Sequence, residues 1–256
     1  MIAGALVISD QDTRSTSTSL GGEYIGQIAK TADGRTWRYG QNGSTSTALS
    51  PGKLAQFDFS GAVKANHLNR TGTTQVAGDL SVTFAVGATA VAADQYRGGY
   101  LVVNAGTGAG QNLLIRGNTK AGSSGSPVVY LKDAIITATS VTDSKFSLVP
   151  NIYSAALIAA SGSPTAVVPL GVPTVSIAAS AAAFPGGTNG WFQVGGPAAV
   201  LANGTPASGG SVIPSATTDG AVDVDGASSV QPKVGYMINT GVSGEYRQVF
   251  LTVNPE

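Results

Sequence analysis

The chain has 256 residues with equal numbers of basic and acidic side chains, and charged residues make up only 11% of it, whereas soluble domains ordinarily carry roughly 25%. The lack of a basic block argues against nucleic-acid binding, and the lack of cysteine excludes disulfides and thiolate metal sites. With 42% hydrophobic residues the chain can bury a core, and its low charge predicts a surface covered partly by protein partners, as in a homo-oligomer or lattice.

The N-terminal residues predict an extended arm. Residues 9–20 are rich in Ser and Thr and nearly free of apolar side chains, so we expect them to become ordered only against a partner. Residues 1–8 lack the basic start of a signal peptide, and no run of about 20 apolar residues suits a membrane helix. The sequence therefore predicts synthesis in a host cytoplasm and no membrane partner.

Residues 24–39 predict a β-hairpin. Asp33-Gly34 favours a tight two-residue turn, and alternation along the returning strand places Trp37 and Tyr39 on one face and Arg38 on the other. A short hairpin beside a flexible arm offers little local core. We therefore expect Trp37 to contact a partner.

Residues 75–150 predict a first β domain. Short alternating or β-branched runs are separated by glycine-rich turns at 106–110 and 122–125, and the helical pattern at 90–97 is too short to form a helical layer. The predicted strands of this domain cover residues 80–86, 100–104, 128–131 and 146–149.

Residues 151–256 predict a second, C-terminal β domain, because apolar runs of about five residues are again bounded by Gly and Pro. The expected fold class is mainly β, with two small sandwich-like or barrel-like units that follow an arm and hairpin region over residues 1–74. The predicted strands of the C-terminal domain include 190–194, 197–201, 235–238 and 244–253.

The sequence offers little for catalysis. His67 is the only histidine, and without a Gly-x-Ser-x-Gly sequence a structural role is expected for it. The glycines of 106–110 lack the spacing of a dinucleotide-binding loop, and the acids of 219–225 lack EF-hand spacing, so a turn and a strand are expected there. We therefore predict no enzyme activity, no catalytic residue, no cofactor and no metal site.

Aromatic and arginine side chains are the candidate interface anchors, because such residues dominate binding energy when they fill desolvated sites. For Trp191 a core position and an interface position are both open. Only 7% of the residues are aromatic, and they do not cluster in sequence as a sugar-binding platform would. The candidate contacts to a protein partner are Trp37, Arg38, Tyr39, Trp191 and Tyr246.

The C-terminal domain resembles a known family. Residues 190–200, with 234–237 and 244–249, carry a Gly-Trp strand and a closing Gly-Glu-Tyr strand, and they resemble the capsid decoration (cement) proteins of tailed bacteriophages. Residues 33–39 and 98–104 resemble virion proteins of the same kind. The resemblance implies a non-enzymatic structural protein of the bacteriophage virion, on the capsid exterior.

Such a protein would bind the major capsid protein and itself, as a dimer or a trimer, and would stabilise the shell. Two alternatives remain. A phage tail or head-fibre component contacting host glycans would be expected to show a repetitive shaft or an aromatic platform. A β-rich glycan-active enzyme would need a close pair of carboxylates.

Overall fold

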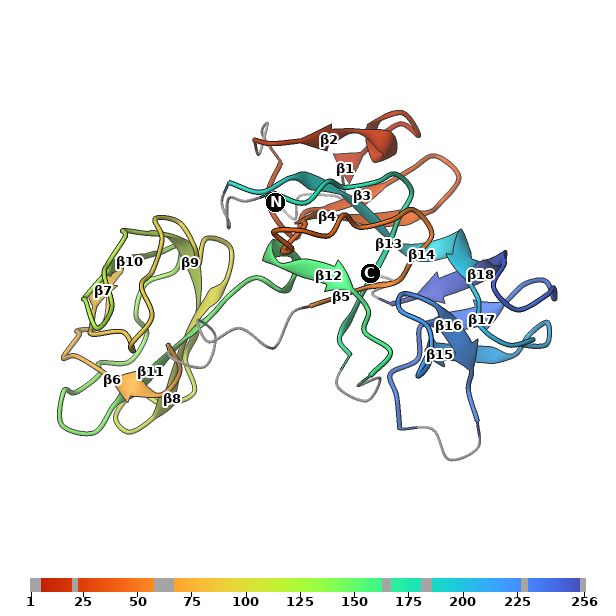
Figure 1. The fold of residues 1–256 in the computed structure, drawn as a ribbon. Helices are drawn as coiled ribbons and strands as arrows, with labels where there is room; N and C mark the ends of the chain where they lie inside the picture. The colour runs from red at the N-terminus through yellow and green to blue at the C-terminus, as the bar shows by residue number, and fades with distance from the viewer. Residues whose placement is uncertain are drawn as a thin grey trace. The chain divides into compact units, whose positions relative to one another are not determined.

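A computed structural model describes residues 6–19, 23–57, 67–162, 167–180, 186–226 and 230–253. The predicted fold class is confirmed: the chain is mainly β, built from sheets that form sandwich-like and barrel-like units (Figure 1). Within the described residues, the helical elements are two single 3-10 turns, η1 (Asp12–Arg14) and η2 (Ile152–Ser154). No helix in that part of the chain is long and apolar enough to cross a membrane.

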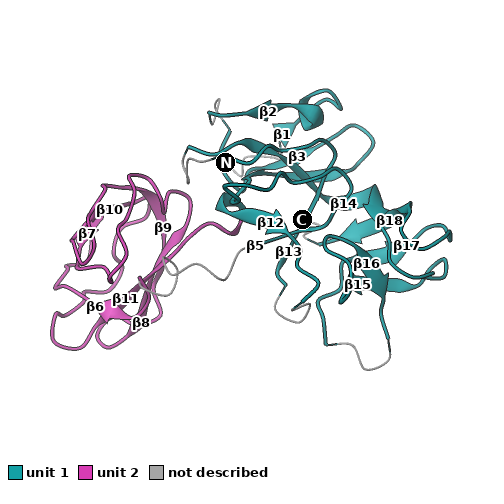
Figure 2. Cartoon of the chain, in the orientation of Figure 1, with its two compact units in different colours: residues 1–58, 153–256 teal, residues 59–152 magenta. Residues whose placement is uncertain are grey.

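The chain forms two compact units, shown in different colours in Figure 2. Unit 1 joins Met1–Asp58 to Tyr153–Glu256, and unit 2 is the continuous segment Phe59–Ile152. These units differ from the three segments 1–74, 75–150 and 151–256 expected from the sequence. The N-terminal region is not separate, because its strands pair with strands of the C-terminal half.

Unit 2 is an antiparallel six-stranded sheet in the order β6-β11-β8-β9-β10-β7. Alternating side chains of β7, β8 and β10 are buried against a core that includes Phe84 and Phe146, whose ring centroids are 5.2 Å apart in an edge-to-face arrangement. Its strands are β6 (Arg70–Thr71), β7 (Ser81–Thr83), β8 (Tyr100–Ala105), β9 (Asn112–Asn118), β10 (Val128–Leu131) and β11 (Lys145–Val149).

Unit 1 contains a twelve-stranded sheet whose main path runs β1-β3-β4-β14-β18-β17-β15-β16. Off this path, β2 and β13 pair with β14, and β5 pairs with β12 and β13. The strands are β1 (Leu6–Val7), β2 (Thr16–Ser17), β3 (Ile28–Lys30), β4 (Thr36–Gln41), β5 (Ala55–Phe57), β12 (Ala156–Ile158), β13 (Pro169–Pro173), β14 (Asn189–Leu201), β15 (Ser211–Pro214), β16 (Val222–Val224), β17 (Gly235–Met237) and β18 (Tyr246–Thr252).

The long strand β14 connects the two hydrophobic cores of unit 1. Its first half pairs with β4 and β13, and its second half pairs with β18. Between the halves the register shifts, and Gly196 adopts a φ of +82°, which favours glycine. The buried Gln193 amide holds this bend, since its Nε2 donates to the carbonyl oxygens of Gly195 and Pro197 at 3.2 and 2.8 Å. Two strands expected from the sequence, 190–194 and 197–201, are thus one bent strand.

The hairpin predicted around Asp33-Gly34 is present. Strands β3 and β4 pair antiparallel, and Gly34 takes a φ of +86° in the turn. The N-terminal arm corrects an expectation, because β1 pairs with β3 and β2 pairs with β14 within the same chain. Within the described residues, Thr16–Ser17 of the predicted arm thus pair with a strand of their own unit, whereas the sequence predicted pairing only with another protein.

Candidate interaction surface

Three of the predicted interface residues lie in the core. Trp37, Tyr39 and Trp191 are at most 3% exposed, and all belong to the core formed around β4 and the first half of β14. The antiparallel register sets Trp191 opposite Tyr39, with their ring centroids 5.0 Å apart. The prediction that Trp37 and Tyr39 contact a partner is therefore wrong for this fold, and Trp191 takes the core position.

The reason is the partner strand of the hairpin. Because β4 lies between β3 and β14, it gains a core from residues that are far away in sequence. The Trp37 indole nitrogen donates to the Thr31 hydroxyl at 3.4 Å, and burial raises the pKa of the Tyr39 hydroxyl to about 12. Arg38 is half-buried, and its Nη1 donates to the Gly26 carbonyl at 2.9 Å, so it supports the hairpin.

Tyr246 is the predicted interface residue that the structure leaves accessible, at 54% exposure. Alternation along β18 places Gln248 and Phe250 on the same face as Tyr246, while Val249 points into the core. Across the sheet Tyr236 of β17 stands opposite Phe250, and their rings stack nearly parallel with centroids 5.1 Å apart.

These side chains belong to a larger surface, which we call the outer face. It spans the second half of β14, β18, and β17 with the residue that follows it, and the registers bring its members side by side. None of them is charged, although charged residues are normally common on a soluble surface. The outer face consists of Pro197, Ala199, Tyr236, Ile238, Tyr246, Gln248, Phe250 and Thr252.

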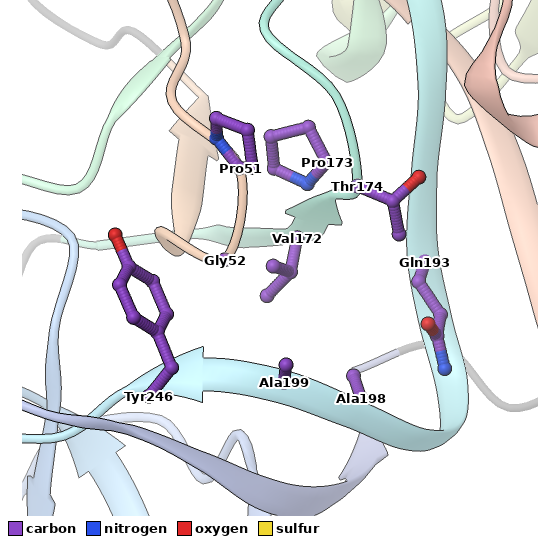
Figure 3. Close-up of a pocket in the computed structure, with 9 residues that line it drawn as sticks. All are labelled: Pro51, Gly52, Val172, Pro173, Thr174, Gln193, Ala198, Ala199 and Tyr246. Atoms are coloured by element: carbon purple, nitrogen blue, oxygen red, sulfur yellow. The ribbon is translucent and has the colours of Figure 1, made fainter.

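A groove of about 460 Å³ adjoins the outer face inside the bend of β14. Figure 3 shows Val172 at its centre, with Pro51 and Pro173 above it and the second half of β14 below. Tyr246 borders one side and packs over Gly52, where a Cβ would lie 2.5 Å from the tyrosine ring. Its lining residues are Pro51, Gly52, Val172, Pro173, Thr174, Gln193, Ala198, Ala199 and Tyr246.

The groove has an uncharged lining. Its polar side chains are Thr174, Gln193 and Tyr246, and it contains neither a carboxylate nor an imidazole. The Gln193 side-chain NH2 group already donates hydrogen bonds to the backbone of the β14 bend. The outer face and the groove share Ala199 and Tyr246, so together they form one continuous uncharged surface.

His67 is buried in unit 2. Its Nε2 lies 2.9 Å from the Thr89 carbonyl oxygen, and its Nδ1 contacts the Tyr96 hydroxyl. A carbonyl can only accept, so the neutral ring carries its proton on Nε2 and the tyrosine donates to Nδ1. Burial, with the nearby Arg70 charge, lowers the pKa of His67. These contacts fit the structural role expected for this residue.

The other candidate sites also have structural explanations. Residues 106–110 form the turn between β8 and β9, and Val222–Val224 forms the strand expected at 219–225. The Asp219 carboxylate accepts hydrogen bonds from the backbone and hydroxyl of Ser161 at 2.8 Å. Across the described ranges, no three acidic, histidine or cysteine side chains gather as a metal site would require.

Period-two alternation of Tyr246, Gln248 and Phe250 was the one sequence signal for the outer face. It could not show that Tyr236 and Pro197 would stand beside these residues, because that depends on strand pairing.

Comparisons with family models, with curated proteins and with solved structures found no match to this chain.

Proposed function

We propose that the chain is a non-enzymatic decoration protein of a phage capsid, which binds the major capsid protein on the outside of the shell and stabilises it. The observation that carries the proposal is the uncharged outer face, with Tyr236, Tyr246 and Phe250 on strands whose opposite sides fill a core. A surface of this kind is depleted in charge and supplied with aromatic residues, as the centres of protein interfaces are.

Two further features support a structural role. The resemblance of residues 190–200 and 244–249 to decoration proteins falls on β14 and β18, which are the strands that form most of the outer face. Decoration by many copies also multiplies weak contacts, so that a modest interface repeated by symmetry suffices for stable attachment. Self-association as a dimer or trimer on the shell belongs to the same proposal.

The test is co-sedimentation of the purified chain with shells assembled from the major capsid protein of the phage that encodes it. The parent chain should pellet with the shells and saturate at a fixed ratio of copies. Gln248→Arg places a charge at the centre of the outer face. It should weaken binding about 30-fold or more, because an unpaired charge buried at an interface costs at least about 2 kcal/mol.

Thr83→Arg is the matched control, because Thr83 is an exposed strand residue of unit 2 and lies outside the outer face. This variant should bind shells like the parent chain. If the parent chain does not pellet with the shells, the decoration proposal fails. If Gln248→Arg binds as well as the parent, a different surface makes the contact.

One observation favours the tail or head-fibre alternative. The Tyr236 and Phe250 rings stack as a parallel pair, and Tyr236 is exposed on the outer face. Exposed aromatic rings can also stack on the apolar faces of sugars. Binding to a glycan array that is lost in Tyr236→Ala, without any binding to shells, would replace the decoration proposal by this one.

A further inference from the structure

Arg247 is a buried cation without a partner. It lies on β18 between the outer-face residues Tyr246 and Gln248, but its side chain points to the opposite side and is only 3% exposed. Its Nε, Nη1 and Nη2 atoms make no hydrogen bond within the described part of the chain. The guanidinium carries a positive charge and five N–H donors, and none of them reaches an acceptor among these residues. Buried charges are normally paired, since desolvation without a partner is strongly unfavourable.

The other basic side chains that we compared have partners. Arg35 forms ion pairs with Asp10 and Asp33, and Lys233 forms one with Asp225 at 3.1 Å. Arg38 also has an unbonded Nε, but its Nη1 donates to a backbone carbonyl. Arg247 therefore differs from them in that all three of its guanidinium nitrogens lack an acceptor.

Only a thin cover separates this guanidinium from solvent. The connection between β17 and β18, residues 238–245, is exposed throughout, and Gly241 lies directly over the arginine. A Cβ built on Gly241 would stand 2.8 Å from Nε of Arg247. The group that lies against Nε at that point is thus the backbone of one exposed glycine.

We infer that the Arg247 guanidinium is a binding site for a carboxylate group that enters at Gly241. A carboxylate is planar and matches the arginine fork with two parallel hydrogen bonds. It also carries a single negative charge, and Arg247 is the only basic residue between Val234 and Val253. A divalent phosphate would need more positive charge than this single arginine supplies.

The position of the site indicates where the carboxylate comes from. Residues 238–245 form the rim of the outer face, to which Ile238 itself belongs. Because Arg247 points away from the outer face, an Asp or Glu side chain of a bound protein would reach it past Gly241, at the exposed connection, and not through the outer face itself. A free carboxylic acid offers the same chemistry. The inference does not depend on the capsid proposal, because it can be measured on the free protein.

Glu245 is a carboxylate of the same chain that could compete with an external ligand for Arg247. Its Oε2 would lie 3.3 Å from the same Cβ position on Gly241, but that oxygen accepts a hydrogen bond from the Val242 backbone at 3.1 Å. If Glu245 turned to Arg247 in solution, the guanidinium would already be neutralised within the chain. A test of the carboxylate site must therefore separate the two acceptors.

The experiment follows the arginine Nε–Hε resonances of the full chain by NMR during titration with sodium acetate, with sodium chloride at equal ionic strength as the reference. The Arg247 resonance should shift saturably with acetate and not with chloride, and the Arg38 resonance should not move. A short blocked peptide containing one Glu should produce the same shift at lower concentration if the natural ligand is a protein side chain. Tighter binding of acetate than of the peptide would indicate a free acid.

Gly241→Ala keeps the arginine but places a methyl group against Nε, and it should weaken acetate binding by roughly 30-fold or more if one buried charge-assisted contact is lost. Arg247→Met should abolish the acetate dependence of the melting temperature, and Glu245→Gln should leave it in place. Absence of any acetate-specific shift would overturn the inference. So would a double-mutant cycle in which Glu245→Gln and Arg247→Met are strongly coupled in the acetate-free protein, because Glu245 would then be the partner.

Discussion

Unit 2 completes its sheet within one continuous segment of the chain, whereas unit 1 joins segments from both ends. In unit 1 the Gln41 amide donates to Asn189, across a separation of 148 residues, and β14 pairs with β2, β4, β13 and β18. Closing such long loops costs entropy before any contact forms. The difference teaches that unit 2 forms its sheet from contacts within one segment, although β6 still pairs with the distant β11, while unit 1 depends on the register of one central strand that joins both ends of the chain.

The same comparison explains how unit 2 is inserted. Phe57 at the end of β5 pairs with Ala156 at the start of β12, so the chain leaves unit 1 and returns to it at neighbouring positions. Each unit also has hydrophobic clusters of its own. We therefore expect the two units to unfold as separate transitions, and the following predictions test that separation.

The largest expected effects come from removing a buried ring in each unit. Trp37→Ala should cost about 3–5 kcal/mol of unfolding free energy in unit 1, and Phe146→Ala should cost a similar amount in unit 2. Calorimetry should show one transition shifted in each variant and the other unchanged. Both tryptophans lie in unit 1, so Trp191 fluorescence identifies its transition. A single transition that moves in both variants would contradict the separation.

A smaller effect is expected at the bend of β14. Gly196→Ala should destabilise unit 1 by about 1–2 kcal/mol, because a residue with a Cβ is strained at positive φ. Its added Cβ would also stand 3.2 Å from the Arg35 side chain. Gly122→Ala in unit 2 is the control, since a Cβ there meets no atom within 4 Å. Denaturant titration measures the loss of unfolding free energy in each unit relative to the parent chain, and equal losses for the two variants would show that the bend is not strained.

Features set by local turns could be predicted from the sequence, whereas features set by the pairing of distant strands could not. The turns at Asp33-Gly34 and 106–110 were predicted correctly, because Gly at those positions permits the backbone geometry of a tight turn. The core position of Trp37 could not be predicted, because the strand that buries it is β14. Of the predicted interface residues, Tyr246 is on the outer face. The burial of the neighbouring Arg247 could not be predicted, because arginine is normally an exposed residue.

The single histidine is expected to make the stability of unit 2 depend on pH. Burial lowers the pKa of His67 below its usual value of 6.5, so the unfolded chain binds the proton more readily than the folded one. The stabilising contribution is complete above pH 6.5 and is lost as pH falls through the folded pKa. The slope should approach about 1.4 kcal/mol per pH unit at most, for one proton. His67→Gln should remove this slope from the unit 2 transition, and an unchanged slope would assign it to another group.

The smallest effect on stability is expected on the outer face. Tyr246→Ala should change the unfolding free energy of unit 1 by no more than about 0.5 kcal/mol, as exposed substitutions usually do. Tyr39→Ala is the matched comparison, because the same side chain is removed from the core of the same unit, at an expected cost of about 3–5 kcal/mol. For binding to shells, Tyr246→Ala should have the larger effect and Tyr39→Ala the smaller one. Tyr246→Ala should lower the affinity of the folded protein, whereas the folded fraction of Tyr39→Ala should bind normally. If Tyr246→Ala destabilised unit 1 as much as Tyr39→Ala, its contact with Gly52 would be structural, and the tyrosine could not be assigned to the interaction surface.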